Sequence, residues 1–223
     1  MMASALQRVV GPRVGAEELG RHRARYALPA LALAAARILL LVSVFLPYWS
    51  MVLEAPQYPD GLELVAYPNR LEGDVKEIDG LNHYTGMRPL HDAASMERAA
   101  SVWMVIAMAV LIELAAVVHS RWALLLALPV LCFPAGFLLD LQYWLWSHGT
   151  SLDPKAPLSS SVKPFVPPAL GIGTIGQFRT LGSVELGWWF ACASSAATLL
   201  GMWLHRRAYK PLHDALRAQE AAG

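Results

Sequence analysis

Four long apolar stretches, nearly free of charged residues, constrain the fold more than any other feature of the chain. They cover residues 28–49, 99–118, 122–146 and 184–204. Each has about the twenty residues that a helix needs to cross the hydrocarbon core of a bilayer. Only 16% of the chain is charged, whereas a soluble domain carries roughly a quarter. We therefore predict an all-α membrane protein with four transmembrane helices surrounded by lipid.

Basic residues set the expected orientation, because the short segments on the cytoplasmic side of a membrane are enriched in Lys and Arg. Arginines or lysines occur in the N-terminal tail (1–27), the turn at 119–121 and the C-terminal tail (205–223). The long segment 50–98 is mostly acidic, and the segment 147–183 has few charges. We therefore expect both termini in the cytoplasm and two long loops on the outer side.

The two outer loops differ in their patterns. In the first, a turn at 59–61 precedes alternating residues at 62–67. A second turn at 68–69 precedes a candidate strand at 71–78, so we predict a small β-hairpin. Residues 80–90 are expected to form a compact loop or a broken helix. The second loop is rich in proline between 154 and 168, which favours an irregular, extended course. Together the loops would cap the helices.

The first loop contains a candidate metal site. His83, Met87 and His91 are spaced four residues apart, so a helix here would place them on one face. Imidazole and thioether donors suit Cu(I) better than Zn²⁺ or Mg²⁺. Alternatively, His83 and Tyr84 pack and form hydrogen bonds within the loop. Gly86 and Pro89, which interrupt a helix, favour this second interpretation. Three further residues on the same side carry suitable donors: Met51, Met96 and His148.

Four ionisable residues lie inside or at the edges of the apolar stretches, where an unpaired charge is costly. Arg37 and Glu113 both fall in the inner half, so we predict an ion pair between the first two helices. Asp140 and Glu185 fall near the outer surface. They are expected to anchor loop residues, with Arg88 and Arg179 as the available partners, or to help bind a cation.

Several functional classes have no support in the sequence. No apolar stretch has a central histidine for haem, and no C-x-x-C-H motif is present. The chain has no phosphate-binding loop that follows a strand, no hydrolase nucleophile motif and no zinc-protease motif. Basic runs with interleaved aromatic residues are also missing, so no nucleic-acid partner is expected. We expect a protein that is not an enzyme.

Several segments resemble a family of small four-helix bacterial membrane proteins. They are Ala55–Pro59, Gly61–Leu64, Gly73–Ile78, Leu81–Met87, Asp140–Tyr143, Leu152–Pro157 and Phe165–Pro168. The resemblance covers both loops and the third apolar stretch, whereas the tails do not take part. Where the family has Gly-His before the Leu-Asp-Pro segment, this chain has His148-Gly149.

The resemblance implies a role beside the enzyme nitrous oxide reductase, because members of the family occur in its gene clusters. The expected protein is an inner-membrane accessory factor with periplasmic loops, acting in assembly, copper supply or electron delivery for this periplasmic copper enzyme. Copper is then the candidate metal of His83, Met87 and His91, with Asn82 and Tyr84 shaping the loop and Asp140 as a further functional position. A structural subunit of a larger membrane complex is the alternative.

Overall fold

The computed structural model describes residues 14–118, 122–158, 161–175 and 177–222. Within them it contains six α-helices and a five-stranded antiparallel sheet, so the prediction of an all-α fold is wrong. The predicted turn at 119–121 lies outside the described residues. The chain divides into two compact units, and the division passes through α3, α5, α6 and α7.

The first unit, here called the sheet unit, comprises Val42–Met104 and Pro134–Phe190. Its strand order is β3-β2-β1-β5-β4, with every neighbouring pair antiparallel. The strands are β1 (Trp49–Ala55), β2 (Tyr58–Ala66), β3 (Leu71–Gly73), β4 (Gly171–Ile175) and β5 (Phe178–Val184). The central strand, β1, therefore pairs with a neighbour from the first predicted loop and with one from the second.

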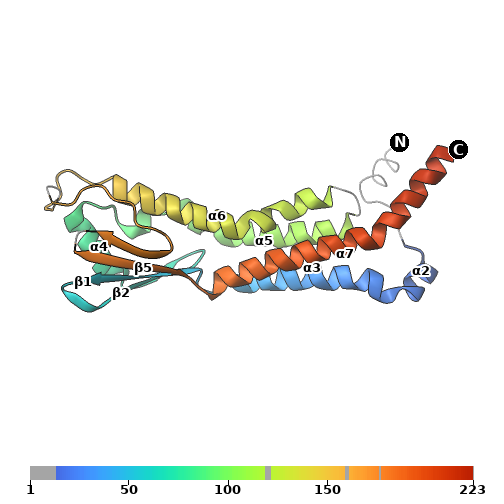
Figure 1. The fold of residues 1–223 in the computed structure, drawn as a ribbon, viewed down its shortest axis with the longest axis horizontal. Helices are drawn as coiled ribbons and strands as arrows, with labels where there is room; N and C mark the ends of the chain where they lie inside the picture. Colours follow the sequence, from blue (N-terminus) through green and yellow to red (C-terminus); the bar gives the residue numbers. More distant parts are fainter. Residues whose placement is uncertain (1–13, 119–121, 159–160, 176, 223) are drawn as a thin grey trace. The chain divides into compact units, whose positions relative to one another are not determined.

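One face of the sheet is apolar because alternate residues of paired strands point to the same side. Trp49 lies opposite Ala66, and Met51 lies opposite Leu64. These residues pack against Ile78 of α4 (Val75–Thr85). The second half of α6 (Ala123–Thr150) covers the same core with Phe137, Leu141 and Leu145. Figure 1 shows α4 lying beside the strands.

The structure corrects several expectations for the loops. The predicted hairpin is present, since β2 pairs with β3 across a turn at 67–70. The strand β1, which pairs with the other edge of β2, was not predicted, so Trp49 belongs to a strand and not to the end of a span. The predicted strand at 71–78 is a strand only at Leu71–Gly73, and the rest belongs to α4. The second loop is not irregular throughout, since its last part forms β4 and β5. A 3-10 turn, η1 (Leu90–Asp92), follows α4.

The second unit, here called the helical unit, comprises Met1–Leu41, Val105–Phe133 and Ala191–Gly223. It contains α2 (Ala16–Arg21) and parts of α3 (Arg23–Ser43), α5 (Ser95–Val117), α6 and α7 (Leu186–Ala222). Small side chains let these helices approach closely. Ser194 Oγ donates a hydrogen bond to the carbonyl of Ala36 at 2.8 Å, and Ser195 Oγ donates to that of Val130 at 2.8 Å.

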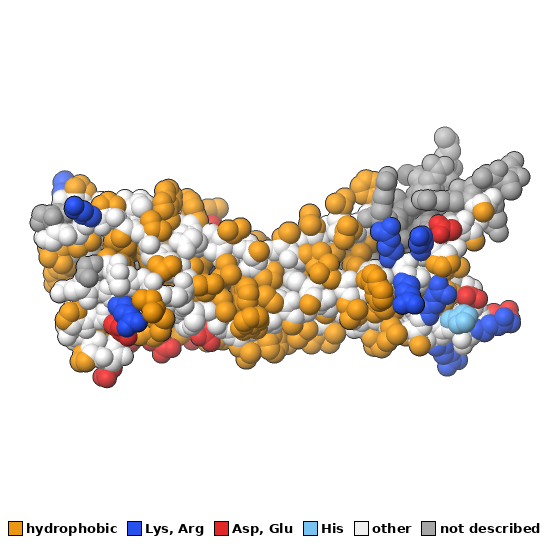
Figure 2. All heavy atoms as spheres, in the orientation of Figure 1, with side chains coloured by type: hydrophobic (Ala, Val, Ile, Leu, Met, Phe, Trp, Pro, Cys, Tyr) orange, Lys and Arg blue, Asp and Glu red, His pale blue; other side chains and the backbone are white. Residues whose placement is uncertain are grey.

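In the part of the chain that the structure describes, three helices are long and apolar enough to cross a membrane: α3, α5 and α6. The prediction of four spanning helices is corrected accordingly. The fourth predicted stretch, 184–204, begins on the last residue of β5 and contains the polar residues Ser194, Ser195 and Thr198. It forms part of α7, which continues to Ala222. In Figure 2, hydrophobic side chains cover much of the surface of the helical unit.

Candidate functional site

The sheet unit contains a partly open cavity of about 150 Å³. The apolar face of the sheet forms one wall, and α4 and the end of α6 form two others. The segment before β4 provides the remaining wall, with Phe165 and Pro167. None of the described lining residues is Asp, Glu, Lys or Arg. The polar side chains on the wall are those of Asn82, Thr85, Trp144, His148 and Thr180.

Helix α4 places Asn82 and Thr85 on the cavity wall. Ile78, Asn82 and Thr85 follow one another at intervals of four and three residues, so they lie on one buried face of the helix. The helix ends at Thr85 because Gly86 adopts a left-handed conformation, with φ of 84°. The backbone carbonyl of Asn82 accepts hydrogen bonds from Met87 N at 2.9 Å and from Thr85 Oγ1 at 3.1 Å.

The end of α6 places Trp144 and His148 on the opposite part of the wall, one turn apart. His148 is 3% exposed, and its Nδ1 lies 3.1 Å from the carbonyl of Trp144. A carbonyl oxygen only accepts hydrogen bonds, so Nδ1 carries a proton and donates it. In a neutral ring, Nε2 is then an acceptor. No described group meets hydrogen-bond geometry with His148 Nε2, although the carbonyl of Pro89 is a neighbour.

Backbone contacts hold the segment 151–170 against both helices. Asp153 N donates to the carbonyl of Gly86 at 2.8 Å, and Leu158 N donates to that of Tyr84 at 3.0 Å. Farther along, the amide of Gln142 donates to the carbonyl of Pro167 at 3.1 Å. The indole of Trp49 donates to the carbonyl of Ala169 at 2.6 Å, which ties this segment to the central strand. These contacts close the cavity on the side of the second predicted loop.

The structure does not bring His83, Met87 and His91 to one pocket. The spacing argument required a helix through all three residues, but α4 ends before Met87. Met87 lines the cavity, whereas the side chains of His83 and His91 are exposed and do not line it. His91 Nε2 instead lies 3.2 Å from a carboxylate oxygen of Asp92. The described residues contain no group of three His, Cys, Asp or Glu able to hold a metal ion.

Copper binding by these three residues therefore stays a prediction without a common pocket to support it. Among the additional donors, Met51 and His148 line the cavity with Met87, whereas Met96 is 81% exposed. Tyr84 is exposed on α4, and its ring centre lies 6.0 Å from that of His83. The alternative interpretation, in which His83 and Tyr84 contact each other, agrees with this ring contact.

The four ionisable residues of the apolar stretches have different surroundings. Arg37 and Glu113 form the predicted salt bridge between α3 and α5. Glu185 accepts a hydrogen bond from Ser50 Oγ at 2.6 Å, and so contacts β1 and not an arginine. Asp140 is half-buried on α6, with Glu97 and Trp144 among its electrostatic neighbours.

The arginines expected to pair with these acids have other partners. Arg88 Nη2 donates to Ser147 Oγ at 2.8 Å. Arg179 Nη1 lies 3.6 Å from Glu54, the residue opposite it on the neighbouring strand. The acidic residues therefore do not anchor the loops in the predicted way.

The sequence interpretation missed two walls of the cavity. Leu141, Trp144, Leu145 and His148 recur at intervals of three and four residues along the end of α6. This pattern indicates a helix face that packs against protein, but the apolar run had been attributed entirely to lipid. Thr85 and Thr180 gave no comparable signal, because threonine on a short element is common on surfaces.

The fold and the cavity define a protein with membrane-length helices and a separate antiparallel sheet unit that contains an apolar pocket. No protein-family model and no curated protein sequence matches the chain.

Proposed function

We propose that the chain is a non-enzymatic accessory protein of the bacterial inner membrane that supports a periplasmic copper enzyme of the nitrous oxide reductase type. One observation carries the proposal. The segments that resemble the family are spread from residue 55 to residue 168, yet all of them fall within the sheet unit. The helical unit contains none of them. The sheet unit is therefore the functional part of this proposal.

Contacts between these segments support the proposal further. Gly86, in the Leu81–Met87 segment, accepts a hydrogen bond from Asp153 of the Leu152–Pro157 segment. Gln142, in the Asp140–Tyr143 segment, donates to Pro167 of the Phe165–Pro168 segment. The segments that carry the resemblance therefore contact one another within the sheet unit.

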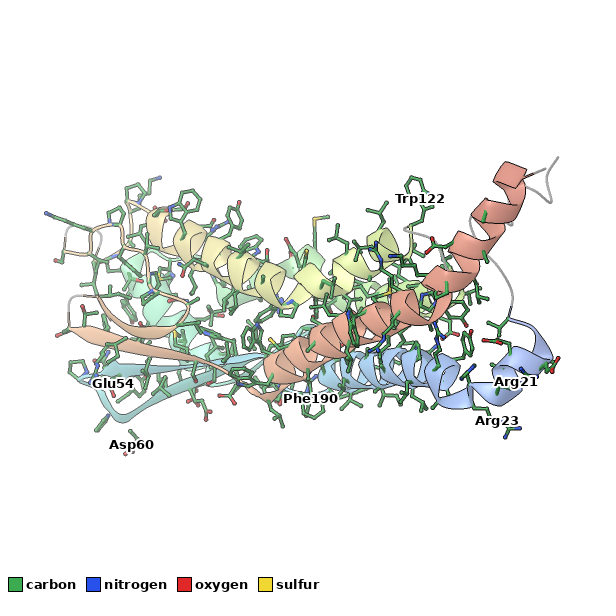
Figure 3. All side chains as sticks on the ribbon, turned by 45° about the vertical axis from the view of Figure 1, so that its right-hand side comes forward. Arg21, Arg23, Glu54, Asp60, Trp122 and Phe190 are labelled. Atoms are coloured by element: carbon green, nitrogen blue, oxygen red, sulfur yellow. The ribbon has the colours of Figure 1, made fainter. Side chains whose placement is uncertain are left out.

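The basic residues at the start of α3 support an orientation with the N-terminus in the cytoplasm and the sheet unit in the periplasm. Arg25 Nη2 donates to the carbonyl of Arg207 at 3.2 Å, so the basic start of α3 and the basic part of α7 are adjacent. Figure 2 shows Lys and Arg side chains gathered there, and Figure 3 labels Arg21 at the end of α2 and Arg23 at the start of α3. By contrast, Figure 3 labels the acidic residues Glu54 and Asp60 on the strands.

The exposed part of α4 is the proposed contact surface for a periplasmic or membrane protein partner. His83 is exposed, and Tyr84 is 56% exposed although it is a large aromatic residue. Exposed aromatic residues are enriched at protein interfaces. The Tyr84 backbone is held by Leu158, so this surface is supported by the segment 151–170.

Deletion of the gene tests the accessory role. We expect cells without the protein to consume less nitrous oxide, and the wild-type chain to restore consumption. Copper content of the purified reductase then separates the possible roles: low copper indicates assembly or copper supply, and normal copper indicates electron delivery. Unchanged consumption in the deletion strain would contradict the proposal.

A matched pair of variants tests the contact surface. His83→Ala/Tyr84→Ala should fail to restore consumption, whereas Lys76→Ala/Glu77→Ala, which changes two exposed residues of the same helix, should restore it. Both proteins must reach the membrane in equal amounts. If the two pairs behave alike, the partner does not contact this part of α4. Stable co-purification within a larger complex, with reductase copper and turnover unchanged by deletion, would instead favour a structural subunit.

A further inference from the structure

Three residues that line the cavity of the sheet unit have a buried polar atom for which no described residue meets hydrogen-bond geometry: Asn82, Trp144 and His148. The indole of Trp144 has Asp140 as a neighbour, and the ring of His148 has the carbonyl of Pro89. Asn82 and His148 are the most deeply buried of the three, at 6% and 3% exposed. Buried polar atoms in folded proteins are normally satisfied, so Asn82 Nδ2 and His148 Nε2 at one cavity indicate a binding site for a polar group.

The two atoms differ in their hydrogen-bonding capacity. Asn82 Nδ2 is an amide nitrogen and can only donate. His148 Nε2 accepts when the ring is neutral, because Nδ1 uses its proton on the carbonyl of Trp144. A ligand that satisfies both must therefore offer an acceptor to Asn82 and a donor to His148. A hydroxyl group has both capacities.

The remaining wall selects an apolar and uncharged ligand. Leu64, Leu141, Leu145, Phe165 and Phe178 contribute to it, and none of the described lining residues is Asp, Glu, Lys or Arg. A charged ligand would lose its hydration without gaining an ion pair. The volume of about 150 Å³ equals that of an engineered apolar cavity that binds benzene. The cavity therefore accommodates a single six-membered ring.

We propose that this cavity binds an uncharged, ring-sized molecule with a phenolic hydroxyl group. The ring would contact the apolar wall, while the hydroxyl oxygen accepts a hydrogen bond from Asn82 Nδ2. A hydroxyl proton is donated to His148 Nε2. Two sources share this chemistry: a soluble phenol, or the hydroquinone head group of a membrane quinol, which has two hydroxyls. The inference goes beyond the accessory role and does not depend on it.

Fluorine NMR of the full-length protein in detergent tests the proposal with para-fluorophenol and fluorobenzene as probes. Both probes should bind the wild-type chain. Asn82→Leu introduces an apolar side chain of similar size and removes the donor. It should therefore weaken the affinity for para-fluorophenol about three- to tenfold, which corresponds to one neutral hydrogen bond. Fluorobenzene binding should not weaken. The matched control, Asn69→Leu, makes the same change at an exposed position and should alter neither affinity.

His148→Leu is a second variant. It should also weaken the affinity for para-fluorophenol and leave that for fluorobenzene unchanged. If neither variant folds, competition in the wild-type protein decides the question. Displacement of para-fluorophenol by para-cresol alone supports a soluble phenol. Displacement by a short-chain hydroquinone at lower concentration than para-cresol supports a quinol head group. No binding of para-fluorophenol, no displacement by either competitor, or an equal effect of Asn82→Leu on both probes would overturn the proposal.

Discussion

Gly86 allows α4 to end next to the segment 151–170. Its φ of 84° lies in the left-handed region, and a Cβ atom added there would lie 2.8 Å from the carbonyl oxygen of Asp153 and 2.9 Å from its nitrogen. A side chain would therefore strain the backbone and separate the two segments. Without this contact, Met87 could not turn from the end of α4 into the cavity wall.

Two alanine substitutions in this region should have opposite effects on stability. Gly86→Ala should lower the free energy of unfolding by about 2 kcal/mol or more, because it adds left-handed strain and a steric clash. Gly80→Ala, inside α4 and exposed with nothing within 4 Å of the added atom, should raise it by about 0.5–1 kcal/mol. Chemical denaturation in detergent measures both values. Equal effects would show that the conformation of Gly86 is not limiting.

A second prediction concerns the ion pair of Arg37 and Glu113 and its contribution to the free energy of unfolding in a bilayer. Either Arg37→Leu or Glu113→Leu leaves one unpaired charge at membrane depth, which costs about 3 kcal/mol. The double variant removes both charges and should lie within about 1 kcal/mol of the wild type. Unfolding measurements on all four proteins complete the cycle. Additive losses in the double variant would contradict an energetic coupling between the two residues.

These residues also show what the sequence could predict. The Arg37–Glu113 pair was predictable because two opposite charges in apolar helices have few other ways to be neutralised. The end of the helix was also signalled, because Gly86 and Pro89 interrupt a helix between His83 and His91. The contact of Gly86 with Asp153 was not, because Asp153 is distant in the sequence and contacts Gly86 through its backbone.

At the scale of elements, the sheet depends on pairings between distant segments. Residues 49–54 pair with residues 179–184 through β1 and β5. The only local signal was the hairpin of β2 and β3. The strand before it, β1, was missed because Trp49 looked like the end of a span. Residues 75–78 were predicted as part of a strand, yet they belong to a helix whose residues Ile78, Asn82 and Thr85 face the core. In both segments, packing against residues distant in the sequence determined the secondary structure.

The indole of Trp49 links the central strand to the segment before β4, so its loss should lower the stability of the sheet unit. Trp49→Phe keeps the aromatic packing but removes the donor to Ala169, leaving a buried carbonyl unsatisfied. The free energy of unfolding should fall by about 1–3 kcal/mol. Trp103→Phe, at a residue that is 73% exposed, is the matched control and should change it by less than about 0.5 kcal/mol. A similar loss in both variants would indicate a general cost of losing tryptophan.

At the scale of the whole molecule, both compact units are assembled from interleaved segments. The sheet unit needs Val42–Met104 and Pro134–Phe190, which are separated by a part of the helical unit. Hydropathy located the three membrane-length helices, because a long uncharged run is a local property. It could not reveal the sheet unit, whose core forms only when Phe137, Leu141 and Leu145 pack on residues of β1 and β2.

This interleaving predicts that the first segment of the sheet unit cannot fold by itself. A chain that ends at Phe133 keeps β1, β2 and β3 but lacks β5, which pairs with β1, and the α6 residues that cover the core. The apolar face would then be exposed and one edge of β1 unpaired. Limited proteolysis should therefore cut residues 50–90 much faster in this truncated protein than in the full chain.

A chain that ends at Leu212 is the matched control, since it loses only the last part of α7, in the helical unit. Residues 50–90 should stay as resistant as in the full chain, because every contact of the sheet core is retained. The comparison separates the loss of sheet partners from a general effect of shortening the protein. Resistance of residues 50–90 in the chain ending at Phe133 would mean that the hairpin and α4 are stable alone. The cavity wall would then form in two independent steps during folding.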